Sequence, residues 1–178
     1  MTGHAGGGLE FDGSDDYIEA QGFAGICGRK ARAVFAWIKT QPEPLARLPI
    51  VAWGKDEPGA YWLIEVDGDQ RLRAFCASGF ISADQQQIGD GAWHHVAVVL
   101  DPVDPARPLI SDVLLYVDGR RRTIYKMEEA QINTACAENL RIGGALAPDS
   151  DKFAGTIDEV MIFNAAVDAT AVRRAHIQ

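Results

Sequence analysis

The chain has 178 residues, of which 47% are hydrophobic and 24% charged, a composition typical of a soluble globular protein with a sizeable core. Asp and Glu total 25 against 17 for Lys and Arg, so the formal net charge is −8, which disfavours nucleic acid and anionic lipid as partners. We recognise neither a secretory signal nor a membrane-inserting apolar run. We expect a flexible Gly-rich leader at residues 1–8 and a single domain at residues 9–178.

The first half of the chain alternates short apolar runs with turn-forming residues, which predicts strands rather than helices. Asp12-Gly13-Ser14-Asp15-Asp16 predicts a turn, because Asp and Ser side chains bond nearby backbone and Gly accepts a positive φ. Asp67-Gly68, flanked by apolar alternation, predicts a hairpin with a type I′ turn. The strands predicted here are 9–11, 17–20, 34–40, 50–53, 61–66 and 72–75.

The second half continues this pattern and ends in the one predicted helix. Strands are predicted at 92–100, 113–117, 140–143 and 156–163, with a second Asp-Gly hairpin at Asp118-Gly119 and a proline-rich loop at 101–108. Residues 168–176 predict a short helix in which Asp168 is the N-cap. About ten strands and one helix predict an all-β fold of two packed antiparallel sheets and exclude a parallel α/β sheet.

The three cysteines, Cys27, Cys76 and Cys136, leave two alternatives open. They allow at most one internal disulfide with one thiol left over, or they are free and buried, and a buried free Cys behaves as a small hydrophobe. We favour the free state from their sparseness. No Cys-x-x-Cys pair is present, which disfavours zinc.

The order of motifs resembles the laminin G-like, concanavalin A-like jelly-roll family of lectins and glucanases, from about Leu9 to Ile177. The motifs are Leu9-Glu10-Phe11-Asp12-Gly13, Ala36-Trp37-Ile38-Lys39, Gly91-Ala92-Trp93-His94-His95-Val96-Ala97, Leu115-Tyr116-Val117-Asp118-Gly119, Leu140-Arg141-Ile142-Gly143-Gly144 and residues 153–167. The resemblance implies a two-sheet antiparallel jelly roll within a larger secreted or surface protein, in an extracellular, periplasmic or surface location. Similar domains bind sugars, bind proteins or serve as accessory modules.

The resemblance also implies a structural Ca²⁺ where the first and last strands lie side by side. Asp12 and Asp158 are then the expected metal ligands, with backbone carbonyls completing a shell of six to eight oxygens. The alternative is that Asp12 only caps its turn and Asp158 bonds neighbouring amides.

Sugar binding requires an aromatic ring beside polar groups that take the hydroxyls. Trp37 and Trp93 lie in strand motifs and are expected in the core, whereas Trp53 or the Tyr61-Trp62 pair is expected to offer an exposed ring. Because Trp62, Ile64 and Val66 form one apolar face, Tyr61 and Glu65 fall on the opposite face. Tyr61 and Glu65 are therefore the candidate ligand-binding residues.

Catalysis has little support in the sequence. Glu65, Asp67 and Asp69 alternate as paired glucanase carboxylates do, but Asp67 and Asp69 bracket a predicted turn instead of lying on a rigid strand. The chain contains neither a Ser or Cys in a nucleophile-elbow context nor a His-Glu-x-x-His spacing that could act with His94 and His95, so we interpret both as structural. The family resemblance implies that His94 or His95 bonds backbone groups. We therefore expect a non-catalytic module that binds carbohydrate. The alternatives are a protein-interaction or structural domain and, third, a glycoside hydrolase or lyase.

Overall fold

A computed structural model describes residues 3–42, 46–84, 87–147 and 150–177. Its strands are β1 (Leu9–Asp12), β2 (Ile18–Ala20), β3 (Arg32–Lys39), β4 (Leu48–Gly54), β5 (Tyr61–Val66), β6 (Leu72–Phe75), β7 (Phe80–Ala83), β8 (Trp93–Leu100), β9 (Val113–Val117), β10 (Arg120–Arg121), β11 (Ile124–Glu128), β12 (Glu138–Ile142) and β13 (Ala154–Phe163). A 3₁₀ turn covers Ile110–Asp112, and the helix α1 covers Ala169–His176.

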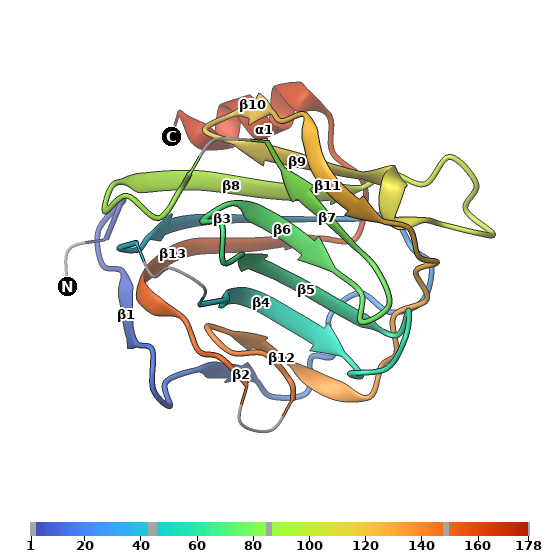
Figure 1. Ribbon diagram of the computed structural model, residues 1–178, viewed down its shortest axis with the longest axis horizontal. Helices are drawn as coiled ribbons and strands as arrows, with labels where there is room; N and C mark the ends of the chain where they lie inside the picture. The colour runs from blue at the N-terminus through green and yellow to red at the C-terminus, as the bar shows by residue number, and fades with distance from the viewer. Residues whose placement is uncertain (1–2, 43–45, 85–86, 148–149, 178) are drawn as a thin grey trace.

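The strands form two antiparallel sheets packed face to face (Figure 1). One has six strands in the order β1-β13-β3-β8-β9-β10, and the other has seven in the order β11-β7-β6-β5-β4-β12-β2. This confirms the predicted all-β antiparallel jelly-roll sandwich with a short C-terminal helix. No helix among the described residues has the length and apolar character needed to cross a bilayer.

The main core lies between the two sheets and is built by strand alternation. In β5, Trp62, Ile64 and Val66 point inward and are at most 1% exposed, as predicted. Trp53 and Trp62 are both fully buried in this core, with ring centroids 5.9 Å apart. The expectation that one of these tryptophans is an exposed ring is therefore wrong, because both occupy inward positions.

A smaller apolar cluster lies on the outer face of the six-stranded sheet, under α1. Phe35, Tyr116 and the helix residue Val172 are buried together there. The helix begins where predicted, since the Asp168 carboxylate accepts a hydrogen bond from the Ala171 backbone N–H at 2.8 Å. The six-stranded sheet is thus covered on both faces along this part of its length.

Residues 3–8 also lie against the outer face of the six-stranded sheet, although the sequence suggested a flexible leader. The His4 ring stacks on Trp37 with ring centroids 3.5 Å apart, and the Ala5 backbone N–H donates to Asp158 at 3.2 Å. Trp37 is buried (5% exposed), but on this outer face and not between the sheets, and Trp93, which was also expected in the core, is only partly buried.

Both Asp-Gly hairpins form, but only one has the expected turn. Asp118 and Gly119 have φ values of 51° and 70°, as a type I′ turn between β9 and β10 requires. Between β5 and β6 the left-handed residue is Gln70 (φ 64°), so the turn spans more residues than the predicted type I′ turn at Asp67-Gly68. The Asp67 carboxylate organises that turn by accepting bonds from the Asp69 and Arg71 amides, each at 3.0 Å.

The cysteines form the single disulfide that the first of the two alternatives allows, so the favoured free state is wrong for Cys27 and Cys136. Cys27 and Cys136 form a disulfide between the segment after β2 and the segment before β12, and Cys76 is a buried free thiol. The Arg32 guanidinium is fully buried beside this region, and it donates to the carbonyls of Ile26 and Gly28 at 2.6 and 2.7 Å. The disulfide and Arg32 together fix the loop that borders one end of β12.

Candidate functional site

The outer face of the seven-stranded sheet carries a row of polar side chains on β2 and β12. Ile18 and Leu140 pack into the core, so the alternating residues Glu19, Asn139 and Arg141 point outward. The antiparallel register places Arg141 directly opposite Glu19. This row lines a surface pocket of about 420 Å³ that reaches to Cys136, and we call it the β12 pocket.

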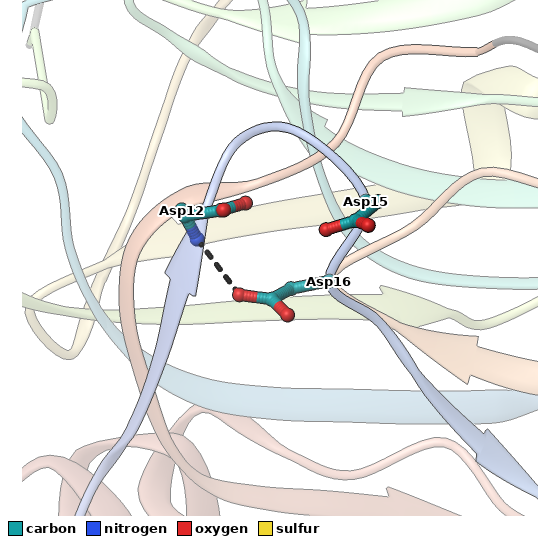
Figure 2. A group of neighbouring side chains, drawn as sticks. All are labelled: Asp12, Asp15 and Asp16. Carbon is teal, nitrogen blue, oxygen red and sulfur yellow. Dashed lines mark hydrogen bonds between the residues drawn. The ribbon is translucent and has the colours of Figure 1, made fainter.

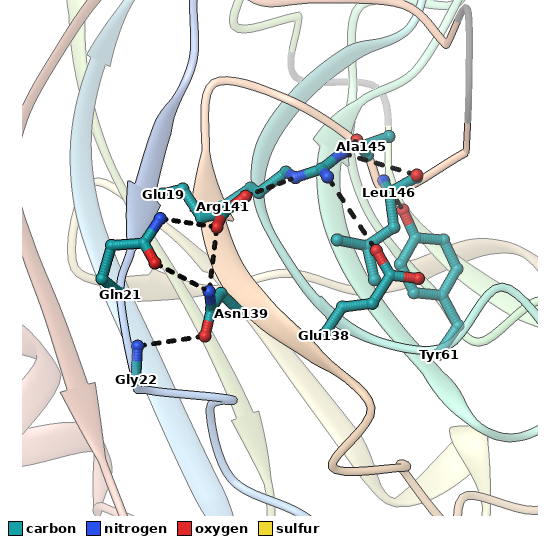
Figure 3. A network of polar contacts seen from close by, with 9 residues as sticks. All are labelled: Glu19, Gln21, Gly22, Tyr61, Glu138, Asn139, Arg141, Ala145 and Leu146. Carbon is teal, nitrogen blue, oxygen red and sulfur yellow. Dashed lines mark hydrogen bonds and ion pairs between the residues drawn. The ribbon is translucent and has the colours of Figure 1, made fainter.

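The Arg141 guanidinium joins this row to the following turn (Figure 3). Its Nη1 donates to the carbonyls of Ala145 and Leu146 at 3.1 and 3.4 Å. Its Nε lies 3.6 Å from a carboxylate oxygen of Glu19, and its Nη2 lies 3.9 Å from one of Glu138. Arg141 therefore ties two strands and a turn into one polar wall.

Asn139 fixes the orientation of the carboxylate beside it. Its amide nitrogen donates to Glu19 at 2.8 Å, and its amide oxygen accepts from the Gly22 backbone N–H at 3.1 Å (Figure 3). The Gln21 amide also donates to Glu19 at 2.8 Å. These bonds, led by that from Asn139, lower the pKa of Glu19, so the carboxylate is ionised at neutral pH.

Tyr17 supplies an exposed aromatic ring next to this polar row. It precedes β2 by one residue and is 44% exposed. The Arg141 guanidinium carbon lies 4.9 Å from the ring centroid, a cation–π contact that orients the ring. An exposed ring beside an amide, carboxylates and a guanidinium provides both stacking and hydrogen bonding to a ligand.

The structure places the two predicted ligand-binding residues, Tyr61 and Glu65, in a second pocket on the same face. This pocket of about 310 Å³, which we call the β5 pocket, is lined by residues of β4 to β6 and by residues 145, 147, 150 and 151. Both side chains are on the predicted face, but each residue is only 2% exposed. The Tyr61 hydroxyl accepts a hydrogen bond from the Leu146 backbone N–H at 3.0 Å, and burial raises its pKa. Tyr61 therefore holds the pocket wall instead of presenting its ring.

Glu65 forms a buried ion pair at the base of the β5 pocket. The Arg73 Nη1 lies 2.8 Å from its carboxylate, and the two side chains are 8% and 2% exposed. Burial raises the pKa of Glu65, while the charges of Arg73 and Arg47 oppose that rise. The Arg73 guanidinium also lies 4.2 Å from the Phe80 ring centroid. The pair is a neutral floor under the pocket.

Asp67 and Asp69, whose carboxylates alternate with that of Glu65, bond residues of the β5–β6 hairpin and of neighbouring strands. Asp67 accepts from the Ser82 hydroxyl at 2.6 Å in addition to its turn amides, and Asp69 pairs with Lys126 at 2.9 Å. Neither residue is among the described residues that line the two pockets.

The predicted metal ligands lie at different points along the pairing of the first and last strands. β1 and β13 are adjacent, as the family resemblance implies, but Asp12 lies opposite Ala154. The structure does not bring Asp158 to Asp12; it groups Asp12 with Asp15 and Asp16 (Figure 2). In this group one carboxylate oxygen from each residue lies within 4.8 Å of the others, so the cluster can hold a metal ion.

The two histidines of β8 are structural in different ways. His94 lies between two carboxylates, with Nδ1 2.9 Å from Asp118 and Nε2 3.1 Å from Asp90, and these partners raise its pKa. His95 is fully buried against Trp37, and burial lowers its pKa to about 4. The contacts of the His94 ring are with carboxylates, whereas the family resemblance suggested backbone groups.

Known families and structures share this architecture. Residues 12–173 match the model of a family described as the concanavalin A-like lectin/glucanases superfamily. A search of curated proteins finds no match.

Two carbohydrate-binding structures and a pentraxin illustrate the structural likeness. Domain 4 of AbnA, a GH43 extracellular arabinanase from Geobacillus stearothermophilus in complex with arabinotriose, is 17% identical with a TM-score of 0.69, covering 98% of this chain and 78% of that one. The CBM40 of the Ruminococcus gnavus IT-sialidase, bound to α2,3-sialyllactose, is 11% identical with a TM-score of 0.72, covering 95% and 96%. A heptameric SAP-like pentraxin from Limulus polyphemus is 16% identical with a TM-score of 0.62, covering 94% and 80%. At these identities the likeness establishes the fold.

Sequence reasoning missed the polar row of the β12 pocket and the Tyr17 ring next to it. Tyr17 and Glu19 alternate with Ile18 and Ala20, and Asn139 and Arg141 alternate with Leu140 and Ile142, so the outward residues were readable from the alternation. What the sequence does not reveal is that β2 and β12 are neighbours, because that pairing joins segments more than 110 residues apart.

The carboxylates around His94 predict a pH-dependent contribution to stability. Because the pKa of His94 is raised above its unfolded value of 6.5, its contribution is fully present below that pH and is lost as the pH rises through the folded pKa. We expect His94→Gln to lower the free energy of unfolding more at about pH 5.5 than at about pH 8.5. Urea unfolding of wild type and His94→Gln at the two pH values measures the free energy of unfolding of each protein. A difference between the two proteins that is the same at both pH values contradicts the prediction.

Proposed function

Because the chain belongs to the concanavalin A-like lectin/glucanases superfamily, we propose that it is a non-catalytic module that binds carbohydrate on the outer face of its seven-stranded sheet. The observation that carries the proposal is the exposed Tyr17 ring, which lies against Arg141 at the border of the β12 pocket. A tyrosine ring stacks on the apolar face of a sugar while the flanking polar groups bond its hydroxyls.

Two features support this face over the rest of the molecule. The six-stranded sheet has its outer face occupied by α1 and by residues 3–8, whereas two pockets open on the seven-stranded sheet. A third pocket, of about 350 Å³, lies between β9, β10 and the start of β11 and has no aromatic ring among its described lining residues. Arabinotriose and sialyllactose in complexes with proteins of the same fold agree with a sugar ligand. Tyr61 and Glu65 then act in this proposal as the wall and floor of the β5 pocket.

A protein-interaction role is the second candidate, and the edge strand β11 favours it. Ile124, Tyr125 and Met127 are 42%, 50% and 50% exposed on this strand, which pairs with β7 on one side only. An edge strand with exposed apolar side chains accepts an added strand from a partner.

We also propose an extracellular or surface location, as part of a larger protein. The Cys27–Cys136 disulfide supports an oxidising compartment, where such bonds persist.

Tyr17 provides the direct test of the carbohydrate proposal. We expect Tyr17→Ala to weaken binding of arabinotriose, or of another oligosaccharide identified on a glycan array, by about fivefold to tenfold, because stacking contributes on the order of 1 kcal/mol. Tyr125→Ala is the matched control: Tyr125 is similarly exposed and also lies by an arginine, Arg71, but it is on the opposite edge of the sheet.

Isothermal titration calorimetry of the three proteins decides between the candidates. Equal binding by wild type, Tyr17→Ala and Tyr125→Ala rejects this face as the sugar site. The absence of any bound glycan, together with a protein partner lost in Tyr125→Ala, favours the protein-interaction role.

For the acidic cluster we propose a structural Ca²⁺ held by Asp12, Asp15 and Asp16, with backbone carbonyls filling the remaining positions. Asp158→Asn is tested as well, because the family resemblance implied Asp12 and Asp158 as the metal ligands. We expect added Ca²⁺ to raise the melting temperature of EDTA-treated wild-type protein but not of Asp15→Asn/Asp16→Asn. If Ca²⁺ raises the melting temperature of the double variant as much as that of wild type, the Asp12–Asp15–Asp16 site is contradicted. If the rise is lost in Asp158→Asn, Asp158 is a ligand, as the family resemblance implied.

A further inference from the structure

We propose that the binding face selects uncharged oligosaccharides and discriminates against glycans that carry carboxylate or sulfate groups. This inference rests on the proposed function and names the ligand class of the same site. It follows from the charge and hydrogen-bonding capacity of the side chains that line the β12 and β5 pockets.

Among the described lining residues, acidic side chains outnumber basic ones. The two pockets hold five carboxylates and two guanidiniums, and even when Arg73 beneath Glu65 is counted the balance is 3 − 5 = −2. The residues are Glu19, Glu138 and Arg141 in the β12 pocket, and Asp56, Glu65, Asp151 and Arg47 in the β5 pocket. An anionic sugar entering either pocket therefore meets net negative charge, and low-dielectric walls strengthen that repulsion.

Arg141 is already counted in this balance, and its N–H donors are engaged within the chain. Recognition of a carboxylate or sulfate by arginine needs two parallel N–H donors aimed at the ligand. The Arg141 Nη1 instead donates to the carbonyls of Ala145 and Leu146, while Nε and Nη2 lie 3.6 and 3.9 Å from the carboxylates of Glu19 and Glu138. An anion that took two of these donors would displace the turn carbonyls or come close to one of the two carboxylates, and both are unfavourable.

The β5 pocket offers no better cation. Arg73 is bound to Glu65 and enclosed by the Phe80 ring, and Arg47 is exposed at a mouth that it shares with Asp56 and Asp151. One guanidinium facing two carboxylates leaves a local charge of −1 above the neutral Glu65–Arg73 floor.

The same side chains suit hydroxyl groups. An ionised carboxylate only accepts hydrogen bonds, so Glu138, Asp56 and Asp151 require donors from whatever occupies the pockets. A sugar hydroxyl donates as well as accepts, whereas a carboxylate or sulfate only accepts. A face rich in acceptors therefore bonds the hydroxyls of a neutral sugar, and it leaves the carboxylate or sulfate group of an acidic sugar without a donor.

Matched pairs of glycans test the inference with the intact chain. Calorimetry compares lactose with α2,3-sialyllactose, and galactotriose with trigalacturonic acid, at about 50 and 500 mM NaCl. For any pair in which the neutral member binds, we expect its affinity to exceed that of the acidic member by on the order of tenfold at low salt, with the ratio shrinking at high salt as the charges are screened.

Replacing pocket carboxylates by amides of similar shape separates the effect of their charge from the effect of their shape. Asp56→Asn/Glu138→Gln removes one carboxylate from each pocket, so the preference for the neutral member should shrink by several fold. Glu128→Gln on β11 is the control, because it removes an exposed carboxylate outside both pockets and should leave the ratio unchanged.

The outcomes distinguish this inference from the function on which it rests. Tighter binding of the acidic members, lost in Arg47→Gln, overturns the charge selection and leaves carbohydrate binding intact. Binding of no glycan, neutral or acidic, across the array and the pairs overturns both. A preference unchanged by salt and by the double variant also overturns the electrostatic account.

Discussion

The guanidinium of Arg141 holds the turn at residues 143–146 against the outer face of the seven-stranded sheet, and the candidate site depends on that contact. It satisfies two carbonyls of the turn while facing carboxylates on β2 and β12. Once the turn is in place, Leu146 donates to Tyr61 and closes one wall of the β5 pocket. Gly143 begins the turn with a φ of 78° and lies so near the Phe11 ring that a larger side chain would collide with it.

The two faces of the sandwich have different roles because they are covered differently. On the six-stranded sheet, α1 buries Phe35 and Tyr116, and His4 stacks on Trp37, so the apolar side chains of that face are occupied within the chain. The seven-stranded sheet carries charged and amide groups that remain accessible in two pockets. A ligand that both stacks and forms hydrogen bonds fits this second face.

Much of the fold could be predicted from the sequence, because strand alternation and turn residues act locally. The ten predicted strands, the helix with its Asp168 cap and the inward face of β5 are all present. β7, β10 and β11 were missed: β10 is only two residues long, and every residue of β11 is exposed, so that strand lacks an alternating apolar pattern. The Asp67 hairpin formed with a different turn, because its carboxylate bonds amides farther along the chain.

The site was less predictable because it depends on which strands become neighbours. Tyr61 and Glu65 were placed on the correct face, yet both are buried. Tyr61 is bonded by Leu146, which is 85 residues away in the sequence, whereas Glu65 is paired with Arg73 across the β5–β6 hairpin. The β2–β12 pairing that brings Tyr17 and Glu19 to Arg141 is likewise set by the whole fold.

Mapping a bound neutral oligosaccharide by amide chemical shifts tests the central claim most directly. On titration with a neutral ligand, the account predicts that the perturbed amides are those of Glu19, Asn139, Arg141 and Leu146 around the two pockets. Perturbations confined to β11, or to α1 and residues 3–8, would contradict it and move the binding surface elsewhere on the sandwich.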